Sequence, residues 1–130
     1  DLSFFLRGTI GNDILNATRM AYAQSGFLPG TNALDDPLTY TLSETPRFSN
    51  YYLEKGSFMR LDHLTLGYKI KALNGIRVYF TAQNLFVITK YKGLDPEVPM
   101  DSGDGLTPGV EPREFYPKAR TFSVGLNLNF

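Results

Sequence analysis

The last eleven residues of the chain, 120–130, alternate between large apolar side chains and small or polar ones. Because successive side chains of an extended strand point to opposite faces, this segment has one apolar face and one polar face. The apolar face is formed by Phe122, Val124, Leu126, Leu128 and Phe130. Strands of soluble antiparallel sheets are usually shorter, whereas about ten residues is the length of a transmembrane β-strand. The segment therefore favours a membrane-spanning strand over a strand of a soluble sheet.

The overall composition excludes several classes of protein and of site. The 13 basic side chains are matched by 13 acidic ones, so the basic excess typical of nucleic-acid-binding proteins is absent. The chain has no cysteine, which excludes disulfide bonds, thiolate metal sites and a thiol nucleophile. It has no run of 18 apolar residues, so any membrane crossing is expected to use strands.

Three earlier segments are expected to be strands: residues 2–11, residues 58–70 and a segment that begins at Ile76. Each shows the same alternation of apolar and polar side chains. The chain begins within the first of them, without an initiating methionine or a signal peptide. We therefore expect the sequence to be the C-terminal part of a longer polypeptide.

The second and third of these strands are predicted to form a hairpin through Asn74-Gly75, two residues that tolerate positive φ. With Ile70 opposite Ile76, counting back along the two strands places Asp62 opposite Asn84. Both polar residues would interrupt the apolar face, about 20 Å above the turn. They are expected to mark the upper edge of an apolar band about 25 Å tall.

The same register makes two predictions about the opposite, polar face of the hairpin. Tyr79 should lie over Gly67 and cover its missing side chain. Lys69 should lie beside Arg77, a like-charge pair that is unfavourable unless water or an acidic group is near.

Two long segments, 11–56 and 91–118, separate the strands and are rich in turn-forming residues. The first is expected to contain a short helix, capped by Asn12 or Asp13 and ended by Ser25-Gly26. Its helically spaced residues are Ile14, Leu15, Thr18, Ala21 and Tyr22. Connections that alternate long, short and long match the outer loops and periplasmic turns of an outer-membrane barrel, so the C-terminus should be periplasmic.

Four blocks of the sequence, 57–68, 82–86, 91–97 and 116–130, resemble in order and spacing the C-terminal end of SusC/RagA-family TonB-linked outer-membrane proteins of Bacteroidetes. The resemblance implies an all-β fold, a large 22-stranded transmembrane antiparallel β-barrel with long extracellular loops. Residues 1–130 would supply about four strands of its barrel domain. The plug and the N-terminal domains of the family are absent from this sequence.

The resemblance also implies a function. Such barrels import nutrients, commonly glycans or peptides, with a SusD-like lipoprotein over the mouth and energy from the TonB complex, which contacts the absent N-terminal part. The terminal strand resembles the signal that the barrel-assembly machinery reads, which maps onto Phe122, Val124, Leu126, Leu128 and Phe130. Four strands cannot close alone, so the remainder of the barrel chain and outer-membrane lipid are expected to complete and surround them.

The sequence indicates no enzyme, cofactor or metal site. The only histidine, His63, lacks partners at catalytic spacing and is expected to be a structural residue facing the barrel lumen, with substrate contact as the alternative. The acidic run 101–105 departs from the EF-hand pattern and is expected to be a solvated loop. The other candidates for facing the lumen are Arg7, Lys69, Arg77 and Gln83.

Four aromatic side chains near the loops have two interpretations. They could form an aromatic belt at the membrane interface, or they could stack on sugars. They are Tyr51, Tyr52, Phe115 and Tyr116.

Two other functions are compatible with the residue pattern. A soluble β-rich module could hold a ligand with segments 11–56 and 91–118. A related barrel could serve in assembly or secretion rather than in uptake.

Overall fold

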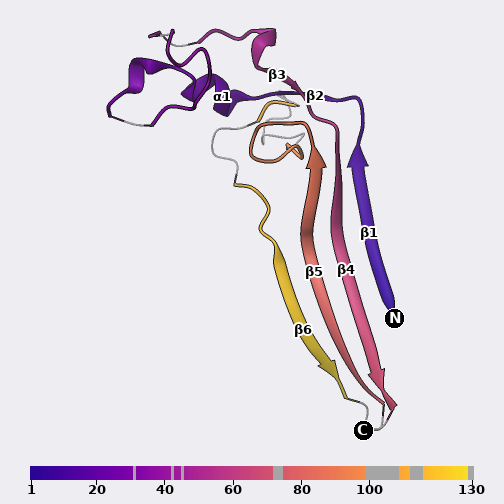
Figure 1. Ribbon diagram of the computed structural model, residues 1–130. Coiled ribbons are helices and arrows are strands. Elements are labelled where there is room, and N and C mark those ends of the chain that lie inside the picture. The colour runs from indigo at the N-terminus through magenta and orange to yellow at the C-terminus, as the bar shows by residue number, and fades with distance from the viewer. Residues whose placement is uncertain are drawn as a thin grey trace. The chain divides into compact units, whose positions relative to one another are not determined.

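The computed structural model describes residues 1–30, 32–41, 43–44, 46–71, 75–98, 109–111 and 116–128 (Figure 1). The chain divides into two compact units. The strand unit comprises Asp1–Thr9, Phe58–Thr89 and Lys118–Phe130, and the loop unit comprises Ile10–Ser57 and Lys90–Pro117. The residues at 74, 101–105, 115 and 130, on which several predictions rest, lie outside the described residues.

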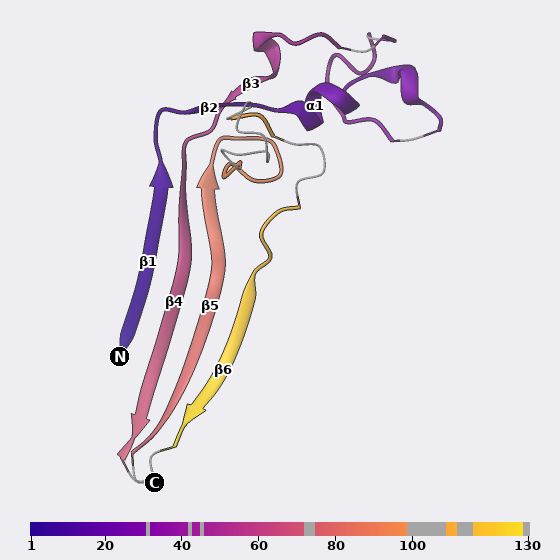
Figure 2. The ribbon, with the colours of Figure 1, turned by 180° about the vertical axis from the view of Figure 1, so that it is seen from behind.

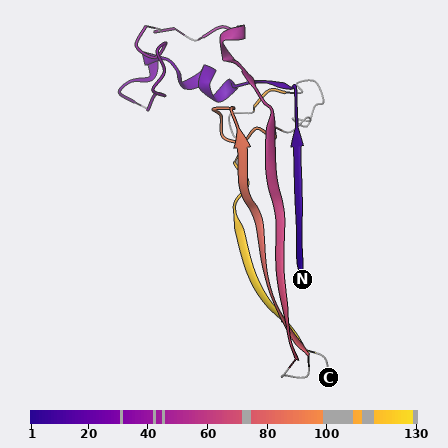
Figure 3. The ribbon, with the colours of Figure 1, turned by 45° about the vertical axis from the view of Figure 1, so that its right-hand side comes forward.

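The strand unit is an antiparallel sheet with the strand order β1-β4-β5-β6. Its strands are β1 (Leu2–Thr9), β4 (Phe58–Ile70), β5 (Ile76–Thr89) and β6 (Thr121–Asn127). The four strands run side by side and share a common twist (Figures 2 and 3). The prediction of four alternating strands, and of an all-β antiparallel fold, is confirmed; the closed barrel is not contained in this chain.

The register of the β4–β5 hairpin agrees with the prediction from its turn. Ile70 pairs with Ile76, and Leu66 pairs with Phe80. On the other side of β5, Phe80 pairs with Val124 of β6. The rings of Phe80 and Phe122 stack with their centroids 6.1 Å apart. The apolar side chains of neighbouring strands therefore lie on one face, which we call the apolar face of the sheet.

The predicted pairing of Asp62 with Asn84 is wrong because a β-bulge interrupts the ladder there. His63 pairs with Gln83 but Leu61 pairs with Phe86, so one residue of β4 is opposite two of β5. Asn84 has a positive φ of 51°, a conformation that asparagine adopts more readily than most residues.

The bulge also changes the face on which Asp62 lies. On the β1 side, Phe5 pairs with His63 and Leu6 pairs with Leu61, so Asp62 is passed over. Its carboxylate instead contacts Arg7 of β1, with Arg7 Nε and Asp62 Oδ2 3.2 Å apart. The apolar face is therefore not ended by Asp62, since apolar residues still pair beyond the bulge.

The prediction that Tyr79 covers Gly67 is also wrong, although the two residues are paired in the register. The Tyr79 ring lies over Gly125 of β6, which occupies the position opposite it on the other side. The space above Gly67 is taken by the side chains of Asp1 and Arg77. A glycine on each side of Tyr79 leaves room for the ring, and the ion pair of Asp1 with Arg77 directs it toward Gly125.

The loop unit contains more regular structure than the sequence predicts. Its elements are β2 (Asp13–Leu15), α1 (Ala17–Tyr22), η1 (Ser25–Phe27), η2 (Asn50–Tyr52) and β3 (Leu53–Lys55). β2 and β3 form a two-stranded antiparallel sheet. Among the described residues, no helix is long and apolar enough to cross a membrane.

The predicted helix is present but begins later and ends earlier than expected. Its cap is Asn16, whose Oδ1 accepts a hydrogen bond from the backbone N–H of Arg19 at 2.8 Å. Asn12 and Asp13 do not cap it, because Asp13–Leu15 is drawn into pairing with β3. Ile14, only 1% exposed, anchors this pairing in a small apolar core with Tyr91 and Val98.

A second segment of the loop unit is fastened to this core. The backbone N–H groups of Leu15 and Glu111 bond to the carbonyls of Gly109 and Leu15, at 2.8 Å and 3.0 Å. The fully buried Glu111 carboxylate accepts a hydrogen bond from the Leu94 N–H. Burial and the nearby Glu111 carboxylate raise the pKa of the Tyr91 phenol well above its usual value.

Candidate functional site

One candidate surface is the polar face of the sheet, opposite its apolar face. Register places Thr65 opposite Thr81, and Lys69 opposite Arg77. Its polar side chains include Arg7, Asp62, His63, Thr65, Lys69, Arg77, Thr81 and Gln83, and Phe5, paired with His63, lies on the same side. All five residues predicted to face a lumen are among them, so the structure brings Arg7, His63, Lys69, Arg77 and Gln83 to one side of the sheet. That this side lines a channel stays a prediction.

Hydrogen bonds connect the middle of the polar face. His63 Nε2 and Thr65 Oγ1 are 2.7 Å apart, and Thr65 Oγ1 is 3.4 Å from Thr81 Oγ1. With Gln83 paired beside His63, this part of the face carries several hydrogen-bond donors and acceptors. Such groups can exchange hydrogen bonds with water or with a polar solute.

The like-charge pair predicted on this face has the acidic neighbour that it requires. Lys69 and Arg77 are paired in the register, and Arg77 Nη2 is 2.6 Å from Asp1 Oδ2. The Asp1 carboxylate offsets part of the repulsion between the two cations.

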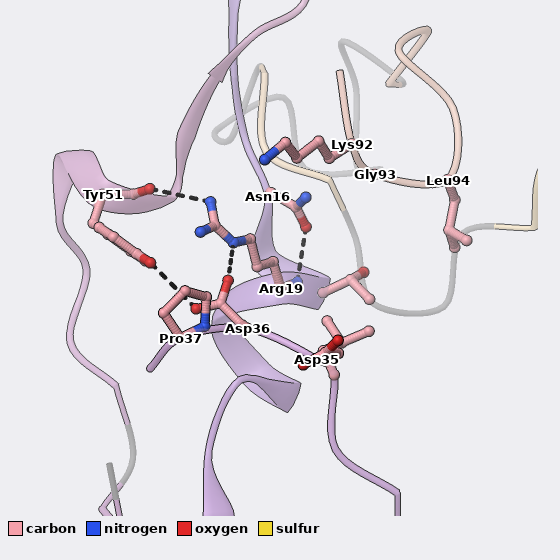
Figure 4. Close-up of a pocket in the computed structure, with 11 residues that line it drawn as sticks. Asn16, Arg19, Asp35, Asp36, Pro37, Tyr51, Lys92, Gly93 and Leu94 are labelled. Atoms are coloured by element: carbon pink, nitrogen blue, oxygen red, sulfur yellow. Dashed lines mark hydrogen bonds and ion pairs between the residues drawn. The ribbon is translucent and has the colours of Figure 1, made fainter. Parts of the chain in front are cut away.

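A second candidate site lies in the loop unit and is built around Arg19 of α1. Its Nε donates to Asp36 Oδ2 at 2.6 Å, and its Nη1 lies 3.3 Å from Glu54 Oε1. The guanidinium carbon is 4.6 Å from the centroid of the Tyr51 ring. Tyr51 in turn donates its hydroxyl to Asp36 Oδ1 at 3.2 Å (Figure 4). Arg19 thus connects the helix to three other parts of the segment 10–57.

These contacts shift the pKa values of the Arg19–Asp36 pair in opposite directions. Burial alone would raise the pKa of the Asp36 carboxyl, but hydrogen bonds from the Leu38 N–H, Arg19 and Tyr51 outweigh it and lower that pKa. Burial alone would lower the pKa of Arg19, but the hydrogen bond and charge of Asp36 raise it. Both side chains are therefore held in their charged forms.

Glu54 extends this network to the second long segment. Its Oε1 accepts hydrogen bonds from Asn16 Nδ2 at 3.2 Å and from Arg19 Nη1 at 3.3 Å. Its Oε2 accepts one from the backbone N–H of Lys92 at 2.9 Å. One carboxylate thereby joins the helix cap, the helix and residues 90–98.

Next to this network is a pocket of about 410 Å³. Figure 4 shows the Arg19–Asp36 pair and Tyr51 beside it, with Lys92, Gly93 and Leu94 coming from the second segment. We call this space the loop pocket. Its volume is within the range of small-molecule binding sites, about 300–1,000 Å³.

The loop pocket was not predicted from the sequence. Arg19 lies 17 residues from Asp36 and 35 from Glu54, and no local periodicity connects positions so far apart. The available signal was the pair Asp35-Asp36 before Pro37, a turn-forming combination with two carboxylates next to each other.

The predicted aromatic cluster is divided by the structure. Tyr51 is partly exposed and lines the loop pocket, whereas Tyr52 is buried against it in an edge-to-face contact with centroids 5.2 Å apart. Tyr52 can therefore neither stack on a sugar nor lie in an interfacial belt, and both interpretations are wrong for it. Tyr116 is exposed, and the residue at 115 lies outside the described part of the chain.

Comparison with known proteins gives relatives that cover the whole chain, although no protein-family model matches it. The TonB-dependent receptor SusC of Bacteroides thetaiotaomicron is 37% identical over 146 aligned residues, covering 100% of this chain. The TonB-dependent receptor P3 of Formosa agariphila is 31% identical over 154 aligned residues, also covering 100%. The chain spans only 14% and 15% of the lengths of these two relatives.

Solved structures give the same result for the fold. The RagAB peptide importer in its closed-closed state matches 96% of this chain with a TM-score of 0.70 and 26% sequence identity. The match covers 15% of the importer chain. These proteins are receptors and importers rather than enzymes, in agreement with the expectation that this chain is not an enzyme. The order of the four sequence blocks, the antiparallel sheet and these matches together show that the chain belongs to the SusC/RagA family of TonB-dependent receptors.

Proposed function

We propose that residues 1–130 form part of the barrel wall of an outer-membrane nutrient importer. The observation that carries the proposal is the apolar face of the sheet, which runs without interruption across four neighbouring strands. Many of its side chains are exposed, among them Val124 at 75% and Tyr68 at 73%. A soluble module would bury such a face, whereas a barrel wall turns it toward lipid.

In this proposal the polar face lines the lumen of the barrel, with Arg7, His63, Lys69, Arg77 and Gln83 in contact with water or with the plug. The strand edges of β1 and β6 are completed by the remainder of the same chain, because unpaired backbone groups in hydrocarbon cost several kcal/mol each. The two long segments are extracellular and the C-terminus is periplasmic, as the alternation of long and short connections favours.

The partners of the whole protein follow from its family. A SusD-like lipoprotein covers the extracellular mouth, and the TonB complex acts through a part of the protein outside this sequence. The barrel-assembly machinery recognises the terminal strand through Phe122, Val124, Leu126, Leu128 and Phe130. The cargo is a glycan or a peptide. The similarity to RagAB, a peptide importer, supports uptake as the activity.

The lipid-facing assignment is tested by placing an arginine on either face of β6 in the complete protein. Val124→Arg would place a charge on the apolar face opposite Phe80, and Ser123→Arg would place it on the polar face opposite Thr81. Near the middle of the membrane the first should cost roughly 2–4 kcal/mol and reduce the assembled protein, while the second should be mild. Ser123 is chosen as the control because its partner on β5, Thr81, is uncharged.

Assembly is measured as the amount of protein in isolated outer membranes, and stability by denaturant unfolding in detergent. Equal loss from the two variants would contradict the lipid-facing assignment. Uptake is measured separately, as growth on defined glycans or peptides by cells with and without the complete gene.

A further inference from the structure

On β6 the column of apolar side chains ends at Phe122, and a cation, Arg120, comes next on the same side. The chain is still held beside β5 at this point. Thr121 pairs with a residue of β5, and the Ala119 carbonyl accepts a hydrogen bond from Asn84 Nδ2 at 3.1 Å. The backbone on both sides of Arg120 is therefore fixed, and the alternation of an extended chain places Arg120 on the apolar face.

No described residue of the strand unit neutralises this cation. Arg120 is exposed and has no hydrogen bond or ion pair with a described residue. The acidic side chains of the strand unit, Asp1 and Asp62, are paired with other arginines on the polar face. A guanidinium at the end of an apolar surface can therefore take its counter-charge from a ligand.

The same face contains a hollow of about 270 Å³. Five residues of its lining belong to the apolar face: Leu66, Tyr68, Val78, Phe80 and Val124. The lining is completed by Asp1, Gly67 and Tyr79. The hollow opens on the apolar face, because the Arg77 side chain that covers the polar side of Gly67 does not line it. Two short side chains among longer neighbours, Val78 and Val124, leave this space open.

The cation and the hollow lie along one line on β6. Val124 lines the hollow and follows Arg120 by four residues, which is about 13 Å for a strand. Phe122 lies between them and is 58% exposed. Its ring stacks on Phe80, which also lines the hollow. An apolar path therefore joins a positive charge to a hollow with a mostly apolar lining.

We propose that Arg120 and the apolar column next to it bind a phosphorylated lipid of the outer leaflet. The phosphate pairs with the Arg120 guanidinium, whose N–H groups suit the oxygens of a phosphate. One acyl chain follows Phe122 and ends in the hollow. An anionic lipid matches both the charge and the apolar path, whereas a free phosphate matches only the charge. The inference rests on the proposed function, which turns the apolar face toward lipid and places segment 91–118, just before β6, outside the cell.

The test uses the complete protein, freed of lipid in mild detergent, and native mass spectrometry to count bound lipid. The probes are lipid A and the same lipid A after enzymatic removal of its phosphates. Lipid A should bind saturably and about tenfold more tightly than the dephosphorylated form, which lacks the charge-assisted bonds to Arg120. Inorganic phosphate in excess should not displace it, and displacement would overturn the lipid in favour of free phosphate.

Replacing the cation tests its role in recognising the phosphate. Arg120→Gln should weaken the binding of lipid A about tenfold, so that the two forms of the lipid bind alike. Lys71→Gln is the matched control, because Lys71 is an exposed cation of the same unit at the turn end of β4, and it should leave the preference unchanged. Equal effects of the two variants, or equal binding of both lipids by the unmodified protein, would overturn the proposal.

Filling the hollow tests the path of the acyl chain. Val78→Phe should weaken the binding of both forms of lipid A to a similar extent, because it displaces the chain and not the phosphate. Leu6→Phe is its control, because Leu6 lies on the apolar face of β1 and does not line the hollow. Equal effects of these two variants would overturn the proposed path along β6.

Assembly in the outer membrane separates this proposal from the proposed function. If Val124→Arg assembles as well as Ser123→Arg, the apolar face is not turned toward lipid and both proposals fail. If Val124→Arg does not assemble, while Arg120→Gln assembles and binds lipid A as the unmodified protein does, the barrel wall is supported and the lipid site is overturned.

Discussion

The strand unit and the loop unit are specified in different ways. In the strand unit, alternation along each strand and one short turn set the register, so partners such as Leu66 and Phe80 follow from counting. In the loop unit, polar side chains far apart in sequence set the structure, with Arg19 joined to Asp36 and Glu54. The strand register should therefore survive the loss of any single side chain of the pattern, whereas the loop unit depends on the one cation at the centre of its network.

The largest effect is expected from removing that cation. Arg19→Met would leave the Asp36 and Glu54 carboxylates without their partner in a largely buried setting, and should destabilise the loop unit by about 3 kcal/mol. Lys55→Met, which breaks an exposed pair with Asp13, should cost less than about 1 kcal/mol. Proteolysis and hydrogen exchange of the complete protein measure both. Protection of β4 and β5 should be unchanged, and its loss would mean that the two units are not specified separately.

A smaller effect is expected from a tight contact in the strand unit, that of Gly125 with the Tyr79 ring. Gly125→Ala would place a methyl group against the Tyr79 ring and should cost about 2 kcal/mol by overpacking. Tyr79→Ala in the same protein should relieve most of this cost, so the two changes are not additive. Denaturant unfolding of the single and double variants gives the coupling. Additive costs would show that the ring does not lie over Gly125.

A still smaller loss of stability is expected from removing the cap of helix α1. Asn16→Ala removes the bond to the Arg19 N–H and the bond to Glu54, and should cost about 1 kcal/mol. Asn16→Asp would keep the cap but would place a carboxylate beside Glu54, so it should recover only part of the loss. Hydrogen exchange at the Arg19 amide reports the cap directly, and unchanged exchange in Asn16→Ala would contradict its role.

The smallest effect is expected from acid, which should weaken the contribution of Asp36 to the stability of the loop unit. Because the folded-state pKa of Asp36 is lowered, its stabilisation is fully present above the ordinary aspartate pKa of about 4 and is lost as the pH falls through the lowered value. Proteolysis of the loop unit should accelerate below about pH 4 in the unmodified protein. Asp36→Asn should remove this part of the pH dependence, and an unchanged acid limb in that variant would assign it to another carboxylate.

Much of the strand unit could be predicted because its information is local. Gly75, at the end of the turn, has a positive φ of 78°. With the alternation on either side, the turn fixes the pairing from Ile70–Ile76 onward. The bulge could not be predicted, because two polar residues at 62 and 84 are as compatible with an edge of the apolar face as with a bulge. Only the three-dimensional contact of Asp62 with Arg7 decides that the polar residue turns to the other face.

In the loop unit, the existence of a helix could be predicted but not its start. Asn12, Asp13 and Asn16 are all good caps, and the choice among them is made by pairing of β2 with β3, some 40 residues later in the chain. The loop pocket depends on contacts of the same long range, so a sequence pattern could indicate its aromatic residue Tyr51 but not the site.

The three bonds to the Glu54 carboxylate have a consequence for how the loop unit orders. One oxygen is shared by Asn16 and Arg19, and the other holds the Lys92 amide of the second segment. Neither segment can leave without disturbing the bonds of the other, so the two should open and close as a single cooperative unit. Anything that engages residues 92–94 from outside would then also change how often the distant helix α1 unfolds, although it touches no residue of that helix.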